Sequence, residues 1–129
     1  MSFLDYVREQ ISRRIDAVAQ ESLKSDLSED GVHDLRVAIR RLSESLRVFE
    51  DLFPQGSAKA VRKDLKAGMR LAGEVRNHDI AIDLLRKARL AGVLAMRQAR
   101  SEAASRLGDC LKAWNENVSA RAWLEQLHV

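Results

Sequence analysis

Apolar residues recur every three to five positions in long segments of this chain, and this spacing constrains its fold more than any other feature. It matches the 3.6 residues per turn of an α-helix, which gathers such residues on one face. The first segment predicts an amphipathic helix from about residue 3 to residue 24. Its apolar positions are Leu4, Val7, Ile11, Ile15, Val18 and Leu23. The polar run 25–31 is the predicted connection, and either Ser28 or Asp30 is expected to cap the next helix.

A second and a third segment continue the same period. The second is expected to run as a helix to Phe53, and the run Pro-Gln-Gly-Ser at 54–57 supplies its stop and the cap of the helix that follows. The apolar positions of the two segments are Val32, Leu35, Ile39, Leu42, Leu46, Phe49 and Phe53, then Val61, Leu65, Met69, Ala72, Val75, Ile80, Ile82 and Leu85. Gly68 and Gly73 each cost the third helix about 1 kcal/mol relative to alanine, and close approach of another helix is one reason for a glycine there.

The pattern breaks at residues 90–92, after which a fourth segment predicts another helix. Its apolar positions are Val93, Met96, Ala103, Leu107, Cys110, Leu111 and Trp114. The polar run 115–117 indicates a turn, and Ser119 is expected to cap a short helix with Trp123, Leu124 and Leu127. No segment alternates apolar and polar residues as a strand does. The sequence therefore predicts an all-α fold: a single domain over residues 1–129, an antiparallel helical bundle of four long helices plus a short C-terminal helix.

Several classes of function find no support in the sequence. The one cysteine, Cys110, excludes an intrachain disulfide and a cysteine-based metal site. His33 and His78 lie on different predicted helices and His128 is terminal, so no metal is expected. There is no glycine-rich phosphate loop and no nucleophile beside a base, so we expect neither an enzyme nor a cofactor. With no signal peptide and no stretch long enough to span a membrane, a cytoplasmic protein is expected.

Basic residues gather on one face of the second predicted helix and on one face of the third. At about 100° per residue, each set falls within an arc of about 60°. The sets are His33, Arg36, Arg40 and Arg47 on the second helix and Lys59, Lys63, Lys66 and Arg70 on the third, with Arg62 at the edge. Each arc lies beside the apolar stripe, so antiparallel packing would place the two arcs on the walls of one groove. The mutual repulsion of these cations favours a polyanionic ligand.

The residues around these cations indicate the class of ligand. Arg outnumbers Lys sixteen to six; guanidinium groups bind phosphate oxygens in bidentate fashion, although a GC-rich genome would give the same excess. Neither aromatic residues, which stack on bases, nor Asn and Gln, which read base edges, are interleaved with the cations. We therefore expect no sequence-specific binding of nucleic acid. The alternative interpretation is a pair of solvated helix faces with acidic partners four residues away. Those partners are Glu44, Glu50, Asp64 and Glu74, of which Glu44 points into the basic arc.

The run 32–49 resembles the signature helix of the CHAD domain, the conserved-histidine α-helical domain. It carries the order Val-His-x-x-Arg-Val-x-x-Arg-Arg-Leu, followed by a Leu and a Phe. The run 71–80 is similar to a second motif of that family, Leu-Gly-x-Val-Arg-Asp-x-Asp, from which it departs at Ala72 and Asn77. Arg76 and Asp79 match this motif, and their spacing suggests an ion pair between them. Ser43 stands where the family often has another arginine.

This resemblance implies a helical domain that binds inorganic polyphosphate through a basic groove and has no catalytic activity of its own. Family members are usually about twice this length and consist of two similar four-helix halves, so this chain resembles one half, and a homodimer would restore the second. The implied polyphosphate-binding residues are His33, Arg36, Arg40, Arg47, Lys59, Arg62, Lys63, Lys66, Arg70 and Arg76. For His33, a structural hydrogen bond is an equal alternative. The implied location is the cytoplasm or a polyphosphate granule.

Two rival interpretations come from other classes of protein. An interaction module would dock acidic protein partners or nucleic acid through the same faces, and its preference among polyanions would distinguish it. A histidine phosphotransfer domain is also a helical bundle, and His33 with Arg36 three residues later has the required spacing. Those domains need a small residue after the basic one, however, and Val37 is branched.

Overall fold

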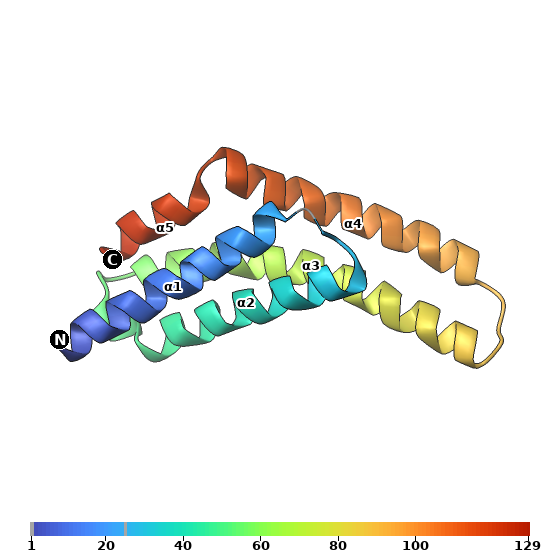
Figure 1. The fold of residues 1–129 in the computed structure, drawn as a ribbon, viewed down its shortest axis with the longest axis horizontal. Coiled ribbons are helices and arrows are strands. Elements are labelled where there is room, and N and C mark those ends of the chain that lie inside the picture. Colours follow the sequence, from blue (N-terminus) through green and yellow to red (C-terminus); the bar gives the residue numbers. More distant parts are fainter. Residues whose placement is uncertain (1, 25) are drawn as a thin grey trace.

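The computed structural model describes residues 2–24 and 26–129 and shows a bundle of antiparallel helices (Figure 1). In chain order the elements are α1 (Phe3–Leu23), α2 (Glu29–Val48), the 3₁₀ turn η1 (Glu50–Leu52), α3 (Ser57–Lys87), α4 (Val93–Glu116) and α5 (Ser119–Leu127). These residues contain no strand. The predicted all-α fold, with four long helices and a short C-terminal one, is confirmed.

Local side-chain chemistry fixes the starts of the first two helices. The backbone N–H of Asp5 donates to Ser2 Oγ at 3.1 Å, and the Ser2 N–H donates back to the Asp5 carboxylate at 3.4 Å. This reciprocal pair is a capping box. Of the two candidate caps for α2, Ser28 is the one used, because its Oγ accepts from the N–H of Gly31 at 3.2 Å. Gly31 therefore lies inside the first turn of α2 and not in the connection, and Ser25 of that predicted connection lies outside the described residues.

Two predicted helix boundaries are wrong. The second helix ends at Val48 and not at Phe53; Phe53 follows the turn η1 and is buried in the core. The run 54–57 does supply the cap of α3: it is Gly56, which is left-handed with φ of 80°. The cap of α5 is Val118, also left-handed with φ of 50°, and not Ser119. Hydrophobic period alone does not report such backbone turns.

The core lies where α1, α2, α3 and α4 face one another, and α5 folds back to pack against α1. The predicted apolar stripes supply most of it. Its largest fully buried side chains are Trp123, Ile11, Ile15, Leu35, Ile39, Leu42, Leu46, Leu65, Leu107, Leu127, Val7 and Val18. The indole Nε1–H of Trp123 donates to the Asp64 carboxylate at 3.0 Å, which satisfies the polar atom of this buried ring.

Gly68 and Gly73 turn out to have different surroundings. A Cβ at Gly68 would overlap the ring of Trp114 on α4, so close helix approach is confirmed there. At Gly73 a Cβ would meet no atom within 4 Å, so close approach does not explain that glycine.

The second half of α3 and the first half of α4 project beyond the bundle as a helical hairpin (Figure 1). The last buried residue of α3 is Val75, and the first buried residue of α4 is Ala103. We call residues 76–102 the hairpin arm. The start of α1 and the end of α5 lie at the opposite end of the molecule.

Candidate functional site

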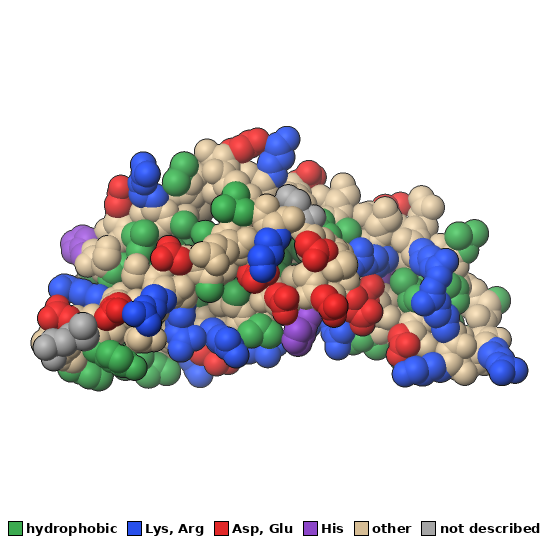
Figure 2. Space-filling view, viewed as in Figure 1, with side chains coloured by type: hydrophobic (Ala, Val, Ile, Leu, Met, Phe, Trp, Pro, Cys, Tyr) green, Lys and Arg blue, Asp and Glu red, His purple; other side chains and the backbone are tan. Residues whose placement is uncertain are grey.

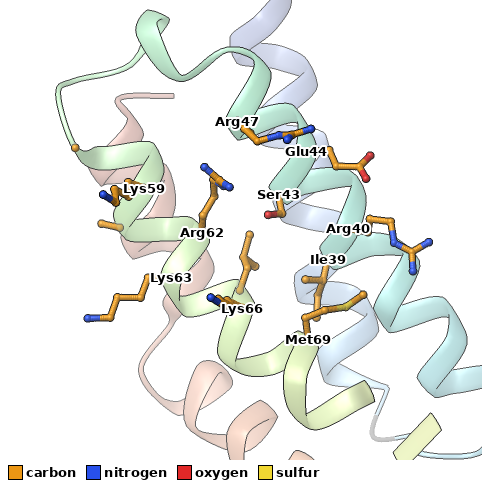
Figure 3. A pocket seen from close by; sticks show the side chains of 13 residues that line it. Ile39, Arg40, Ser43, Glu44, Arg47, Lys59, Arg62, Lys63, Lys66 and Met69 are labelled. Carbon is orange, nitrogen blue, oxygen red and sulfur yellow. The ribbon is translucent and has the colours of Figure 1, made fainter. Parts of the chain in front are cut away.

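A pocket of about 880 Å³ opens between α2 and α3, and we call it the α2–α3 groove (Figure 3). It is lined by Ile39, Arg40, Ser43, Glu44, Arg47, Gly56, Lys59, Ala60, Arg62, Lys63, Leu65, Lys66 and Met69. Six of these side chains are cationic and one is a carboxylate. The lining therefore has a net positive charge of five within a chain whose net charge is +3.

The helical period explains why cations line this groove. Ile39 and Leu65 belong to the apolar stripes that hold α2 against α3, and both are buried. The basic residues stand beside these stripes, so they border the packed seam instead of pointing straight out to solvent. The short connection 49–56 makes the two helices antiparallel, which places Arg47, near the end of α2, and Lys59, near the start of α3, at the same end of the groove on opposite walls.

Arg62 is the most enclosed cation of the groove. Its side chain extends from α3 into the space between the two helices (Figure 3). Its Nε is buried and has no hydrogen-bond partner within residues 2–24 and 26–129. A buried donor without an acceptor costs about 1–3 kcal/mol. An anionic oxygen in the groove would be the acceptor that this group needs.

A second group of cations lies toward the start of α2, where Arg36 has Arg40 and Arg76 as neighbours. The Nε of Arg36 is also buried without a partner among the described residues. Burial first, and then the positive charges of Arg40 and Arg76, lower the pKa of the Arg36 guanidinium from its ordinary value. Arginine stays charged nonetheless, so the three guanidinium groups repel one another.

The ten residues predicted to bind the ligand fall into three sets. The groove holds Arg40, Arg47, Lys59, Arg62, Lys63 and Lys66. Arg36 and Arg76 lie beside Arg40 in the second group. His33 and Arg70 do not line the groove; both are exposed, and Arg70 pairs with Glu74 on its own helix at 3.2 Å.

The predicted ion pair between Arg76 and Asp79 is wrong. Arg76 points to α2, where Glu29 Oε1 lies 3.5 Å from its Nη1. Asp79 points to α4 and accepts from Arg100 Nε at 3.0 Å. Although the two side chains are only about 60° apart around α3, each pairs with a different neighbouring helix, Arg76 with α2 and Asp79 with α4.

The acidic residues expected to pair with cations four residues away on the same helix have different roles in the structure. Glu74 does pair with Arg70, and its other carboxylate oxygen lies 3.5 Å from Arg106 on α4. Asp64 serves instead as the acceptor for Trp123. Glu44 lines the groove, as its position in the basic arc indicated.

The sequence places Arg62 at the edge of the basic arc and includes it among the predicted binding residues, and the structure shows its side chain extending into the space between the helices. Sequence reasoning misses Arg100, which bonds Asp79 and also donates to the backbone carbonyl of Leu27. It thereby ties the α1–α2 connection to the hairpin arm, and only the fold brings these segments together.

The cations that line the groove suit it to holding anions.

Other kinds of site find no support in the structure. Among the residues that the structure describes, no group of three or more His, Cys, Asp and Glu side chains is placed to hold a metal ion. Burial raises the pKa of the Cys110 thiol, which keeps it protonated at neutral pH. None of the described helices combines the length and apolar character needed to cross a membrane.

Comparison with known proteins gave one match. The CHAD domain matches residues 7–128, which is nearly the whole chain. A search of curated proteins and a search of solved structures each found no match. The match includes both stretches that resemble the family's motifs, the run 32–49 on α2 and the run 71–80 on α3, and the chain therefore belongs to the CHAD domain family.

Proposed function

We propose that this protein binds inorganic polyphosphate in the α2–α3 groove and catalyses no reaction on it. The observation that carries the proposal is Arg62, a half-buried side chain whose Nε is buried and unpaired among the described residues, in a groove of six cations and one carboxylate. The CHAD family, which is known for binding polyphosphate, supports the same ligand. A chain of phosphates brings regularly spaced anionic oxygens, the acceptors that guanidinium and ammonium groups prefer.

A linear ligand suits the distribution of the cations. Arg47 and Lys59 stand at one end of the seam between α2 and α3, Arg62 and Lys66 follow along α3, and Arg40 leads toward the second group at Arg36. A polyphosphate chain that runs along the seam would meet both unpaired guanidinium groups. We assign no ligand contact to His33 or Arg70, because neither lines the groove.

A second candidate ligand is an acidic peptide. The groove is not purely polar: Ile39, Leu65 and Met69 contribute apolar surface to it. Apolar side chains of a partner protein would be buried there, whereas polyphosphate has none to offer. This favours an acidic protein segment over duplex DNA as the alternative partner.

The test is a titration of the purified protein with long-chain polyphosphate, duplex DNA and an acidic peptide that contains leucine, over a series of salt concentrations. We expect polyphosphate to bind more tightly than DNA at equal phosphate concentration and more tightly than the peptide. Arg62→Met, which keeps the length of the side chain, should weaken polyphosphate binding at least ten-fold, about 1.4 kcal/mol. Arg121→Met, an exposed residue on α5, is the matched control and should not change it.

Two results would contradict the proposal. Equal and steeply salt-dependent binding of polyphosphate and DNA would reduce the groove to general electrostatic attraction. Preference for the peptide, with Arg62→Met as the weakening variant, would make the protein an interaction module instead.

The family resemblance also supports one proposal about the oligomeric state of the protein and one about its location in the cell. Because family members usually have two four-helix halves, we propose that two copies of this chain associate. We also propose that the protein acts in the cytoplasm or at polyphosphate granules. Imaging of a tagged protein in cells with and without polyphosphate would test the second, since a granule location should disappear with the polymer.

A further inference from the structure

Gly73 weakens α3 without a packing reason. It lies inside the helix, where a glycine costs about 0.5–1 kcal/mol relative to alanine. A Cβ at this position would meet no atom within 4 Å, so no neighbouring helix requires the glycine. The missing side chain instead leaves open space on the surface of α3, and the place of that space decides what it can do.

The open space lies on the side of α3 that faces α2. By the helical period, Gly73 is within about 60° of both Met69 and Arg76. Met69 lines the α2–α3 groove, and Arg76 Nη1 lies 3.5 Å from the carboxylate of Glu29 on α2. Gly73 is therefore on the same face of α3, between the groove and the second group of cations formed by Arg36, Arg40 and Arg76.

Arg36 stands on the opposite side of the seam in this region. The two helices are antiparallel and Glu29 meets Arg76, so Arg36 on α2 is level with about Met69 on α3. Long helical side chains point back toward the start of their own helix, which directs Arg36 along the seam toward the level of Gly73. Its Nε is buried and has no hydrogen-bond partner within the described residues. The seam beside Gly73 thus contains a donor that needs an acceptor.

Positive charge continues along the seam beyond the groove. Figure 2 shows basic side chains along the lower edge of the molecule, where α2 lies, on both sides of a histidine. Arg62 in the groove and Arg76 in the second group are about 21 Å apart along the axis of α3. The acidic neighbour of Arg76, Glu29, is 67% exposed, so this pair is weak and a bound anion could displace it.

One side chain, Met69, stands between the two sets of cations. It extends from α3 toward Ile39 on α2 (Figure 3). A methionine is unbranched and flexible and carries no charge that would repel an anion. A linear polyanion that crosses Met69 comes next to Gly73, where a larger side chain would stand in its way.

We propose that Gly73 determines the chain length that the protein prefers, because its open surface lets one long polyphosphate chain run from Arg62 in the groove to Arg36 and Arg76. This role rests on the proposed function. A chain that reaches both sets of cations makes its second contact intramolecularly, which raises the affinity. Tripolyphosphate has three linked phosphates and is much shorter than the distance between the sets, so it can occupy only one of them.

The experiment is a calorimetric titration of the full chain with long-chain polyphosphate and with tripolyphosphate at constant salt. Gly73→Leu should raise the dissociation constant of the long chain by about ten-fold or more, because the second contact is lost. It should change that of tripolyphosphate by less than about two-fold, because the groove around Arg62 is intact. Gly73→Ala adds only a methyl group and should have a smaller effect on the long chain than leucine.

Two controls exclude an effect through folding. Ala67→Leu adds the same side chain at an exposed position of α3 that does not line the groove, and it should leave both dissociation constants unchanged. Gly73→Leu should be at least as stable as the wild type in urea, because leucine favours a helix more than glycine does and meets no clash at this position.

A double-mutant cycle tests the path of the chain. Arg36→Met alone should weaken binding of the long chain. In the Gly73→Leu background it should have little further effect, because the chain no longer reaches Arg36. Fully additive effects would show that the chain reaches Arg36 whatever residue stands at position 73, and would overturn the proposed role of Gly73.

The outcomes separate this role from the proposed function. If Gly73→Leu leaves long-chain binding unchanged while Arg62→Met weakens it, Gly73 has no part in a function that still stands. Equal weakening of both ligands by Gly73→Leu would place the short ligand at Gly73 itself and overturn the selection of chain length. A wild-type protein that binds neither ligand would overturn the proposed function and the role of Gly73 with it.

Discussion

Arg36 and Arg62 are costly residues at the places they occupy. Each buries a guanidinium Nε without a partner in the described part of the chain, and Arg36 also has two arginines as neighbours. Leaving a buried donor unpaired costs more than an average hydrogen bond gains. Such a residue is expected to stabilise the ligand complex at the expense of the free protein.

Replacement of Arg36 should therefore stabilise the protein without ligand. Arg36→Met removes the unpaired donor and the repulsion from Arg40 and Arg76 while it keeps most of the packing. We expect the free energy of unfolding, measured in urea, to rise by about 1 kcal/mol. The control Arg121→Met should change it by less than about 0.5 kcal/mol. A fall in stability on Arg36→Met would show that this guanidinium already has a favourable partner.

At the scale of the elements, the contact between α3 and α4 depends on a glycine. Gly68 lets α3 approach Trp114, whose ring packs edge-on against Trp123 with centroids 5.3 Å apart. Gly73, five residues later on the same helix, faces open space. Both glycines lie inside α3, so the sequence pattern does not distinguish them; only the packing around each one does.

Alanine at the two positions should thus have opposite effects. Gly68→Ala places a Cβ inside the Trp114 ring, and we expect it to lower the free energy of unfolding by about 1–3 kcal/mol. Gly73→Ala removes the entropy cost of a helical glycine without a clash, and we expect a rise of about 0.5–1 kcal/mol. Thermal or urea unfolding of both variants decides the matter, and equal effects would contradict the close approach at Gly68.

Arg100 links three elements, because it bonds Asp79 on α3 and the Leu27 carbonyl of the α1–α2 connection. The Asp79 side chain is only 11% exposed, so loss of its partner leaves a mostly buried carboxylate unpaired. Arg100→Met should lower the free energy of unfolding by about 2 kcal/mol or more. Hydrogen exchange should become faster around residues 26–28.

The matched control for that change is Arg106→Met. Arg106 also lies on α4 and pairs with a carboxylate of α3, but its side chain is 54% exposed. Exposed pairs contribute little, so we expect a change below about 1 kcal/mol. Similar losses for both variants would mean that the Leu27 contact adds nothing.

On the scale of the whole molecule, the groove concentrates a net charge of five in a chain of net charge +3. Without a ligand this repulsion opposes folding, and salt screens it. We expect the melting temperature to rise with ionic strength when polyphosphate is absent. Polyphosphate at 100 times its dissociation constant should add about 2.7 kcal/mol to the free energy of unfolding at constant salt. A melting temperature that falls with salt would contradict this account of the groove.

The sequence by itself determined the helices, the fold class and the residues of the basic faces. Helical period is a local property, so Ile39 and Leu65 could be assigned to the core and Arg40 and Lys66 to positions beside it without a structure. The cap of α2 is also a local feature, but the sequence left Ser28 and Asp30 as alternatives, and the structure shows that Ser28 is the one used.

Only the tertiary structure decided which of these residues meet. The helical period of the sequence cannot show that Arg62 enters the space between α2 and α3 or that Arg76 pairs with Glu29. It also cannot show that His33 and Arg70 lie outside the groove. Each depends on a neighbour distant in sequence. The exposure of Ile80 is of the same kind, because it lies one turn beyond Arg76, which meets the start of α2 at Glu29, and the position of that start along α3 is set by packing and not by local pattern.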